Sequence, residues 1–245
     1  MTRVLGVIPA RLASTRLPRK VLRDLLGRPL IAHTYAAARR STLLSEVLVA
    51  TDTDEVVAAC RALGIPAVLT SPAHPCGTDR VWEVAQTHPA DVYVNVQGDE
   101  PFVTPGHVEH LVRPFLADAG TQVSTLKIRA TPAEVASPHS PKVVTDRHGR
   151  ALYFSRHPIP YDRDGRGGVA HFKHLGLYAY TAAALEVFHA SPEGELERVE
   201  RLEQLRFLER GIAISVTETD EPTIGIDTEE DFRAAEARLA RLDRS

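Results

Sequence analysis

A cluster of positive charge stands near the start of the chain, between Arg11 and Lys20. Its members are Arg11, Arg16, Arg19 and Lys20, with Ser14 and Thr15 among them. An arginine guanidinium matches two phosphate oxygens at once, and a lysine ammonium is a compact point charge. A loop that leaves the end of a buried strand also presents backbone N–H groups to an anion. The segment therefore predicts a cradle for a triphosphate, and a solvated basic loop is the alternative interpretation.

Two acidic positions far apart in the sequence could complete such a site. Asp99 follows the apolar run that ends at Val96, and Asp227 follows the run Ile224–Ile226. Mg²⁺ prefers carboxylates, waters and phosphate oxygens as ligands. We therefore expect Asp99 and Asp227 to converge on one metal cluster. The alternatives are a turn aspartate at position 99 and a helix N-terminal cap at position 227.

Two common nucleotide-binding motifs are missing from the sequence. It contains no G-x-x-x-x-G-K-[ST], and no G-x-G-x-x-G follows the first apolar run. These absences argue against a P-loop ATPase and against a dinucleotide dehydrogenase.

The first half of the chain alternates short apolar runs with helical patterns. Strands are expected over 3–9, 46–52, 66–70 and 91–96, and helices over 29–40, 54–63, 78–86 and 104–117. Continuous Val, Ile and Leu strands between helices indicate a parallel sheet covered on both faces. Such sheets bind ligands beyond the carboxyl ends of their strands. That edge is predicted to hold 9–20, 51–52 and 97–101.

The second half has closely spaced strands and a different character. Strands are expected over 123–128, 142–146, 151–155, 174–180 and 212–218, and helices over 182–189, 195–210 and 228–242. A hairpin is expected around Gly149, which can take a positive φ. Thr228 is a good N-cap, with Asp231 at the third helical position. We expect a smaller hairpin and helix subdomain beside the main sheet.

The bulk composition limits the classes of function. The chain has 245 residues, 43% of them hydrophobic, and a formal net charge of −3. That charge offers no broad basic surface, so a nucleic-acid partner is not expected. Two cysteines, and no apolar run of about 18 residues, favour a reduced, cytoplasmic setting without a membrane partner.

Seven blocks of sequence, in order, resemble one enzyme family. They are PARLASTRLPRK (9–20), CGTDR (76–80), NVQGDEP (95–101), ALYFSR (151–156), HLGLYAY (174–180), LEQLR (202–206) and GIDTEED (225–231). Together they closely resemble the CMP-Kdo synthetases, the 3-deoxy-manno-octulosonate cytidylyltransferases. The first block is shared more loosely with CMP-sialic acid synthetases, whereas ALYFSR and HLGLYAY point to the Kdo branch. The resemblance runs from Arg3 to about Arg233.

The resemblance implies a fold, a reaction and a set of functional residues. The fold would be a single α/β nucleotidyltransferase domain with a mostly parallel, Rossmann-like sheet. Residues 1–120 would form the nucleotide-binding half, and 121–245 the sugar-binding and dimerisation half of a homodimer. The reaction would transfer CMP from CTP to the C2 hydroxyl of Kdo, release pyrophosphate, and serve lipopolysaccharide biosynthesis with Mg²⁺ as cofactor.

The matching positions fall into three groups. Asp99 and Asp227 match the metal ligands and, with Lys20, would be the catalytic residues. The nucleotide would contact Ala10, Arg11, Arg16, Lys20, Gly77 and Thr78. The sugar would contact Gln97, Arg156, His174, Tyr178, Glu200 and Gln204.

The proposed sugar contacts suit an acidic, polyhydroxylated ring. Arg156 offers a bidentate partner to a carboxylate. Glu200 and Gln204 are four residues apart on one expected helix, so both could face one pocket. The alternatives are structural: a satisfied core histidine at His174, a core tyrosine at Tyr178, and a solvated charge at Glu200.

Two positions depart from the family pattern. Arg19 stands where glycine is usual, so we expect no strongly left-handed backbone there, and its side chain would contact phosphate or solvent. Cys76 stands where serine or threonine is usual, so a hydroxyl contact would be lost. Two other functions remain open: CMP activation of another acidic sugar, such as amino-Kdo or a sialic acid, and a non-catalytic nucleotide-binding module.

Overall fold

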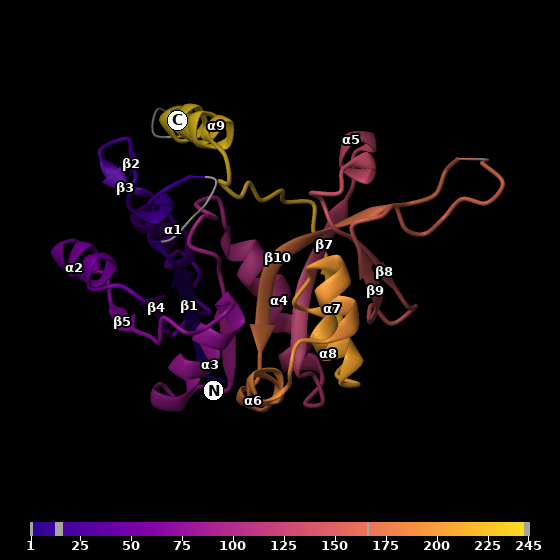
Figure 1. The fold of residues 1–245 in the computed structure, drawn as a ribbon, viewed down its shortest axis with the longest axis horizontal. Helices are drawn as coiled ribbons and strands as arrows, with labels where there is room; N and C mark the ends of the chain where they lie inside the picture. Colours follow the sequence, from indigo (N-terminus) through magenta and orange to yellow (C-terminus); the bar gives the residue numbers. More distant parts are fainter. Residues whose placement is uncertain (1, 13–16, 166, 243–245) are drawn as a thin grey trace. The chain divides into compact units, whose positions relative to one another are not determined.

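The computed structural model describes residues 2–12, 17–165 and 167–242. Contacts between residues divide the chain into two units (Figure 1). The first unit combines residues 1–109 with 223–245, and the second consists of residues 110–222. The C-terminal segment therefore belongs with the N-terminal part of the chain. No helix in the described residues is both long enough and apolar enough to cross a membrane.

The first unit contains a parallel sheet with the order β6-β1-β4-β5. Its strands are β1 (Val4–Ala10), β4 (Glu46–Thr51), β5 (Ala67–Leu69) and β6 (Val92–Asn95). Every residue of β1 is buried. Because successive side chains of a strand point to opposite faces, both faces of the sheet are covered at β1. The predicted parallel sheet is thus confirmed.

Helices of the first unit connect these strands. They are α1 (Leu30–Ala38), α2 (Asp54–Ala62) and α3 (Gly77–Thr87), all predicted, and each packs against strands of the sheet. The Thr53 hydroxyl caps α2 by accepting a hydrogen bond from the Val56 N–H. Helix α4 (Pro105–Ala117) starts in this unit and continues into the second.

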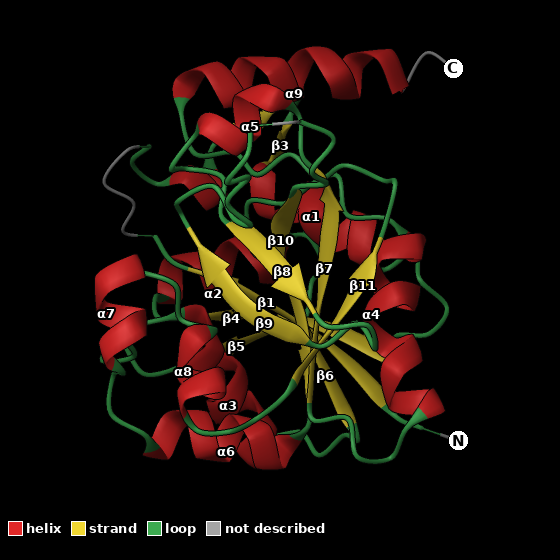
Figure 2. Cartoon of the chain, turned by 90° about the vertical axis from the view of Figure 1, so that its right-hand side faces the viewer, coloured by secondary structure: helices red, strands yellow, loops and turns green. Residues whose placement is uncertain are grey.

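Helix α9 (Glu229–Leu242) closes the first unit and is the long helix at the top of Figure 2. Asp231 accepts hydrogen bonds from the N–H and hydroxyl of Thr228, and the Thr228 hydroxyl accepts one from the Asp231 N–H. The predicted cap is thus confirmed. The apolar side of α9 packs into a cluster of Leu17, Leu25, Leu30, Phe102, Ile226, Phe232 and Ala235. This packing fixes the chain just after Asp227.

A short segment between β1 and α1 was not predicted. It contains the one-turn 3₁₀ helix η1 (Lys20–Leu22) and the hairpin β2 (Asp24–Leu25) with β3 (Arg28–Pro29). Strands of two residues are too short for the alternation that reveals a strand in a sequence.

Arg19 disagrees with the expectation for its backbone. It precedes η1 with φ 56° and ψ 27°, which is left-handed. Its guanidinium pairs with Glu55 at the start of α2, so it contacts a protein carboxylate rather than only solvent. Arg19 lies between the buried residues Leu17 and Lys20 and adopts this conformation despite its cost for a residue with a Cβ atom.

The second unit is built on three strands in the order β11-β7-β10. β7 (Val123–Arg129) runs antiparallel to β10 (Phe172–Tyr180) and parallel to β11 (Ile214–Glu218). The predicted hairpin is β8 (Lys142–Thr145) with β9 (Ala151–Ser155), and Gly149 has φ 75° in its turn. Helix α5 (Pro132–Ala136) was not predicted, whereas α6 (Ala182–Ala190) was.

The single helix expected over 195–210 is wrong. The structure has two short helices, α7 (Glu195–Glu200) and α8 (Leu205–Glu209). Arg201 adopts φ 54° and ends α7, and Leu202 then turns into the core. Glu200 and Gln204 are therefore not on consecutive turns of one helix.

Candidate active site

Three predicted residues of the first unit meet at one point. The Lys20 ammonium lies 2.5 Å from Asp99 Oδ2 and 3.0 Å from Asp227 Oδ1. Asp99 follows β6 at the carboxyl edge of the parallel sheet, and Asp227 immediately precedes the segment that begins α9. The Lys20 side chain is only 11% exposed. The expected convergence of the two aspartates is therefore present in the structure, with an ammonium between them.

Backbone contacts hold the two aspartates in place. The Ile226 N–H donates to the Asp99 carbonyl at 3.0 Å, and the Asp227 N–H donates to Asp231 Oδ2 at 3.0 Å. Gly98 packs against the end of β1, where an added Cβ would lie 3.0 Å from the Pro9 carbonyl oxygen. Glycine at position 98 thus permits the close approach that brings Asp99 beside β1.

The charge of this cluster fits a bound cation. Burial by itself lowers the pKa of Lys20, but the carboxylates of Asp99 and Asp227 more than compensate, so the pKa of Lys20 is raised above its ordinary value. In the described part of the chain, the Lys20 ammonium lies between these two carboxylates. Asp99 and Asp227 could therefore hold a hard divalent cation, because such ions prefer carboxylate oxygens.

The described part of the cationic loop lies at the end of β1. Ala10 is fully buried as the last residue of the strand. The Arg11 guanidinium donates to the Pro75 carbonyl at 2.5 Å, which places Arg11 beside the turn that leads into α3. Arg16 lies outside the described residues, so the structure says nothing about its predicted phosphate contact.

The turn at the start of α3 lies against the same edge of the sheet. A Cβ added to Gly77 would be 3.5 Å from Pro9 and 3.6 Å from the Gln97 amide nitrogen. Thr78 is fully buried. Gln97 also donates to Asn95 Oδ1 at 3.3 Å. The structure therefore brings Gln97, a predicted sugar contact, together with the predicted nucleotide contact Gly77.

Cys76 has a local partner despite its departure from the family pattern. Its thiol donates to Asp79 Oδ2 at 3.1 Å, within the first turn of α3. The thiol therefore forms its hydrogen bond within the first turn of α3.

Sequence reasoning missed a buried ion pair at this edge. Arg80 Nη2 lies 2.6 Å from Asp52 Oδ2, and Arg80 Nη1 donates to Thr70 Oγ1 at 2.7 Å. Burial, and then the nearby charge of Arg11, lower the pKa of Arg80, while Asp52 opposes that shift. The signal was available, since Asp52 ends a predicted strand and Arg80 belongs to the CGTDR block.

The second unit holds the remaining predicted sugar contacts, and two of them are joined. Glu200 accepts hydrogen bonds from the Ser155 hydroxyl at 2.6 Å and from the Arg156 N–H at 2.9 Å. The Arg156 guanidinium donates to the carbonyls of Glu200, Pro138 and Arg201. Arg156 therefore organises the backbone around it as well as carrying a charge.

His174 and Tyr178 lie in a buried row of aromatic rings. Their ring centroids are 5.3 Å apart, and Phe154 packs edge-on against His174. Burial lowers the pKa of His174 to about 3, so this imidazole is neutral at physiological pH. Gln204 is also buried, and its amide nitrogen has no hydrogen-bond partner among the described residues. The sugar-binding roles of these residues stay predictions.

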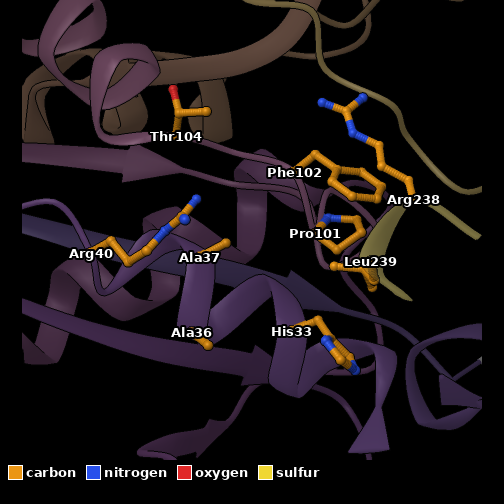
Figure 3. Close-up of a pocket in the computed structure, with 9 residues that line it drawn as sticks. All are labelled: His33, Ala36, Ala37, Arg40, Pro101, Phe102, Thr104, Arg238 and Leu239. Atoms are coloured by element: carbon orange, nitrogen blue, oxygen red, sulfur yellow. The ribbon is translucent and has the colours of Figure 1, made fainter. Parts of the chain in front are cut away.

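A separate cavity of about 420 Å³ lies in the first unit (Figure 3). It is lined by His33, Ala36, Ala37, Arg40, Pro101, Phe102, Thr104, Arg238 and Leu239. The Arg238 guanidinium lies 4.4 Å above the centre of the Phe102 ring. None of the predicted site residues that the structure describes lines this cavity.

The sheet, together with acidic residues beyond its carboxyl edge, defines the class of α/β nucleotidyltransferases. The family model described as "Cytidylyltransferase" matches residues 5–215. Two solved structures with 16% identity share the fold: a cytidylyltransferase from Leptospira borgpetersenii, with a TM-score of 0.65 over 98% of this chain, and a putative glucose-1-phosphate thymidylyltransferase from Bacillus anthracis, with a TM-score of 0.64. The matched region is 88% of the Leptospira chain and 95% of the Bacillus chain.

Relatives with much higher sequence identity show which family of nucleotidyltransferases this chain belongs to. The 3-deoxy-manno-octulosonate cytidylyltransferase of Acidobacterium capsulatum is 55% identical over 96% of both chains. That of Koribacter versatilis is 54% identical over 97% of this chain and 90% of its own. A structure of CMP:2-keto-3-deoxy-manno-octonic acid synthetase complexed with CTP has 41% identity and a TM-score of 0.94, covering 98% of this chain and 99% of its own. The chain therefore belongs to the 3-deoxy-manno-octulosonate cytidylyltransferase family.

Proposed function

We propose that this protein is an enzyme that transfers CMP from CTP to the C2 hydroxyl of Kdo and releases pyrophosphate. The observation that carries this proposal is the convergence of Lys20, Asp99 and Asp227 in a chain with the identities given above. In-line attack of a sugar hydroxyl on the α-phosphorus needs positioning and neutralisation of charge more than covalent catalysis.

Mg²⁺ is the proposed cofactor, held by Asp99 and Asp227. The two carboxylates fit this ion, because both already lie within 3.0 Å of the same ammonium and carboxylate oxygens are ligands that Mg²⁺ prefers. When bound, Mg²⁺ would withdraw charge from the phosphate oxygens. Lys20 and Arg11 would bind the triphosphate, and the Gly77–Thr78 turn would hold the nucleoside.

The sugar would be recognised by the residues predicted for it. The charge of Arg156 suits the carboxylate of Kdo, and Gln97 and Gln204 offer amides to its hydroxyls. The neutral state of His174 is consistent with a hydrogen-bonding role rather than a charged one. We further propose that the enzyme is a cytoplasmic homodimer whose product serves lipopolysaccharide biosynthesis.

A pyrophosphate-release assay tests the reaction. CTP and Mg²⁺ are incubated with Kdo, amino-Kdo and a sialic acid, and each sugar is repeated with ATP, GTP and UTP. Turnover is expected with CTP and Kdo. Turnover with another acidic sugar but none with Kdo would contradict the choice of substrate. Binding of CTP without turnover of any sugar would favour a nucleotide-binding module without catalytic activity.

A further inference from the structure

Lys20 occupies the place of a cation. Both Asp99 and Asp227 lie within 3.0 Å of its ammonium, close enough to accept charge-assisted hydrogen bonds from it. A metal ion bound by both carboxylates would need that same space. From this geometry, we infer that Lys20 is a resident counter-ion that must leave the two aspartates before a metal binds there. This inference rests on the proposed function, which assigns the metal to Asp99 and Asp227.

The environment of Lys20 makes its ammonium a strong competitor of a metal ion for the two carboxylates. Its side chain is 11% exposed and that of Asp99 is 24% exposed, so water screens the attraction of this pair only weakly. Asp227 is 46% exposed, so its attraction to the ammonium is screened more. Val21, the next residue of η1, is buried and anchors the backbone. The ammonium is thus delivered to the aspartates by a fixed segment of chain. A metal can bind only when the ammonium has left the two aspartates. Because that state is a small fraction of the protein, the apparent affinity for a metal alone is reduced by the same fraction.

The nucleotide offers Lys20 another anion. Lys20 ends the cationic segment that is the proposed triphosphate cradle. Arg11, which would bind the triphosphate together with Lys20, lies at the same edge of the sheet and donates to the Pro75 carbonyl. A triphosphate beside Lys20 would draw the ammonium away from Asp99 and Asp227. Metal and triphosphate would therefore enter the site together, and the metal would bind poorly by itself.

Direct measurement of metal binding tests this role. Mn²⁺ is titrated, without nucleotide, into the full-length protein and into the Lys20→Met variant, and free Mn²⁺ is followed by electron paramagnetic resonance. The variant keeps a long, unbranched side chain but removes its charge. We expect Lys20→Met to bind Mn²⁺ at least tenfold more tightly than the unmodified protein. Equal affinities would overturn the inference.

Two controls locate the effect. Arg23→Met also removes one positive charge, but Arg23 pairs with Glu229 and not with the two aspartates, so it is expected to change Mn²⁺ affinity less than threefold. Adding Asp99→Asn to Lys20→Met is expected to abolish the gain. A gain that survives in the double variant would place the metal elsewhere and overturn the inference.

A second measurement needs no variant that could misfold. The chain has only four lysines, Lys20, Lys127, Lys142 and Lys173, so nitrogen-15 spectra of the lysine ammonium groups are simple. We expect Mg²⁺ alone to leave the Lys20 signal in place, and CTP without metal to move it. A shift with Mg²⁺ alone and none with CTP would overturn the inference. The sugar assay tests the proposed function separately. Turnover of Kdo without these binding effects would contradict the role of Lys20 and leave the proposed enzyme activity standing. The binding effects without turnover of any sugar would contradict the proposed activity and leave the role of Lys20 standing.

Discussion

Arg80 Nη2 lies 2.6 Å from Asp52 Oδ2, and this ion pair connects α3 to the end of β4. Arg80 is fully buried, and the Asp52 side chain is 14% exposed. The same guanidinium reaches Thr70 just beyond β5. One side chain of α3 thus joins the carboxyl ends of two strands, and it lies two residues after Thr78.

Arg80→Gln is expected to lower the free energy of unfolding by about 3–5 kcal/mol, because it leaves Asp52 buried without its counter-charge. Urea denaturation measures the change. Adding Asp52→Asn should recover part of the loss, since no unpaired charge then remains. A loss below about 1 kcal/mol for Arg80→Gln would contradict the structural importance of the pair.

Arg19→Gly is expected to stabilise the protein by about 0.5–1 kcal/mol, because glycine adopts the left-handed backbone of position 19 without a Cβ clash. The change also removes the exposed ion pair with Glu55, which contributes little. Glu55→Gln is the matched control, as it removes the pair but keeps the backbone restriction. Thermal and urea unfolding of both variants would decide, and a clear destabilisation only in Arg19→Gly would refute the argument.

Stability is expected to depend on pH through His174. Its pKa is about 3 in the folded protein and near 6.5 when unfolded, so below pH 6.5 the unfolded chain binds a proton that the folded chain does not. Stability is therefore lost as pH falls from 6.5 towards 3, by roughly 2 kcal/mol between pH 6.5 and pH 5. The free energy of unfolding at pH 7 and pH 5 measures this loss, and His174→Gln should lose correspondingly less. The same pH dependence in both proteins would rule out His174 as the cause.

Arg156→Ala is expected to raise the KM for Kdo at least tenfold and to leave the KM for CTP within about threefold, because one charged hydrogen-bonding partner of a carboxylate is removed. Arg156→Lys controls for charge. It keeps the positive charge but lacks the three separate nitrogen atoms with which Arg156 contacts its three carbonyls. A defect confined to CTP would move Arg156 to the nucleotide side of the reaction.

Asp99→Ala is expected to reduce kcat by at least a hundredfold while Kdo binding changes little, because the variant removes a proposed metal ligand rather than a sugar contact. Steady-state kinetics at increasing Mg²⁺ and a direct Kdo-binding measurement test the two parts. Near-normal turnover at saturating Mg²⁺ would refute the assignment of Asp99 as a metal ligand.

Local patterns predicted most elements. Val4–Ala10 and Glu46–Thr51 are apolar runs between helical stretches, and such runs form buried parallel strands wherever both faces of a sheet are covered. The cap at Thr228 depends only on residues three apart, so it too was predictable. The break at Arg201 was not, because helical periodicity continues through it, and burial of Leu202 overrides that periodicity.

Some features of the candidate site could likewise be predicted from the sequence, and others could not. Residue type and spacing by themselves determined that Asp99 and Asp227 follow apolar runs, and that a cationic segment follows the first strand. Only the tertiary structure decided that Lys20 stands between the two aspartates and that Arg80 pairs with Asp52. Asp99 and Asp227 are separated by about half of the chain, and nothing in their local sequence specifies the distance between them. That distance depends on how β1, β6 and α9 pack, which is a property of the whole first unit.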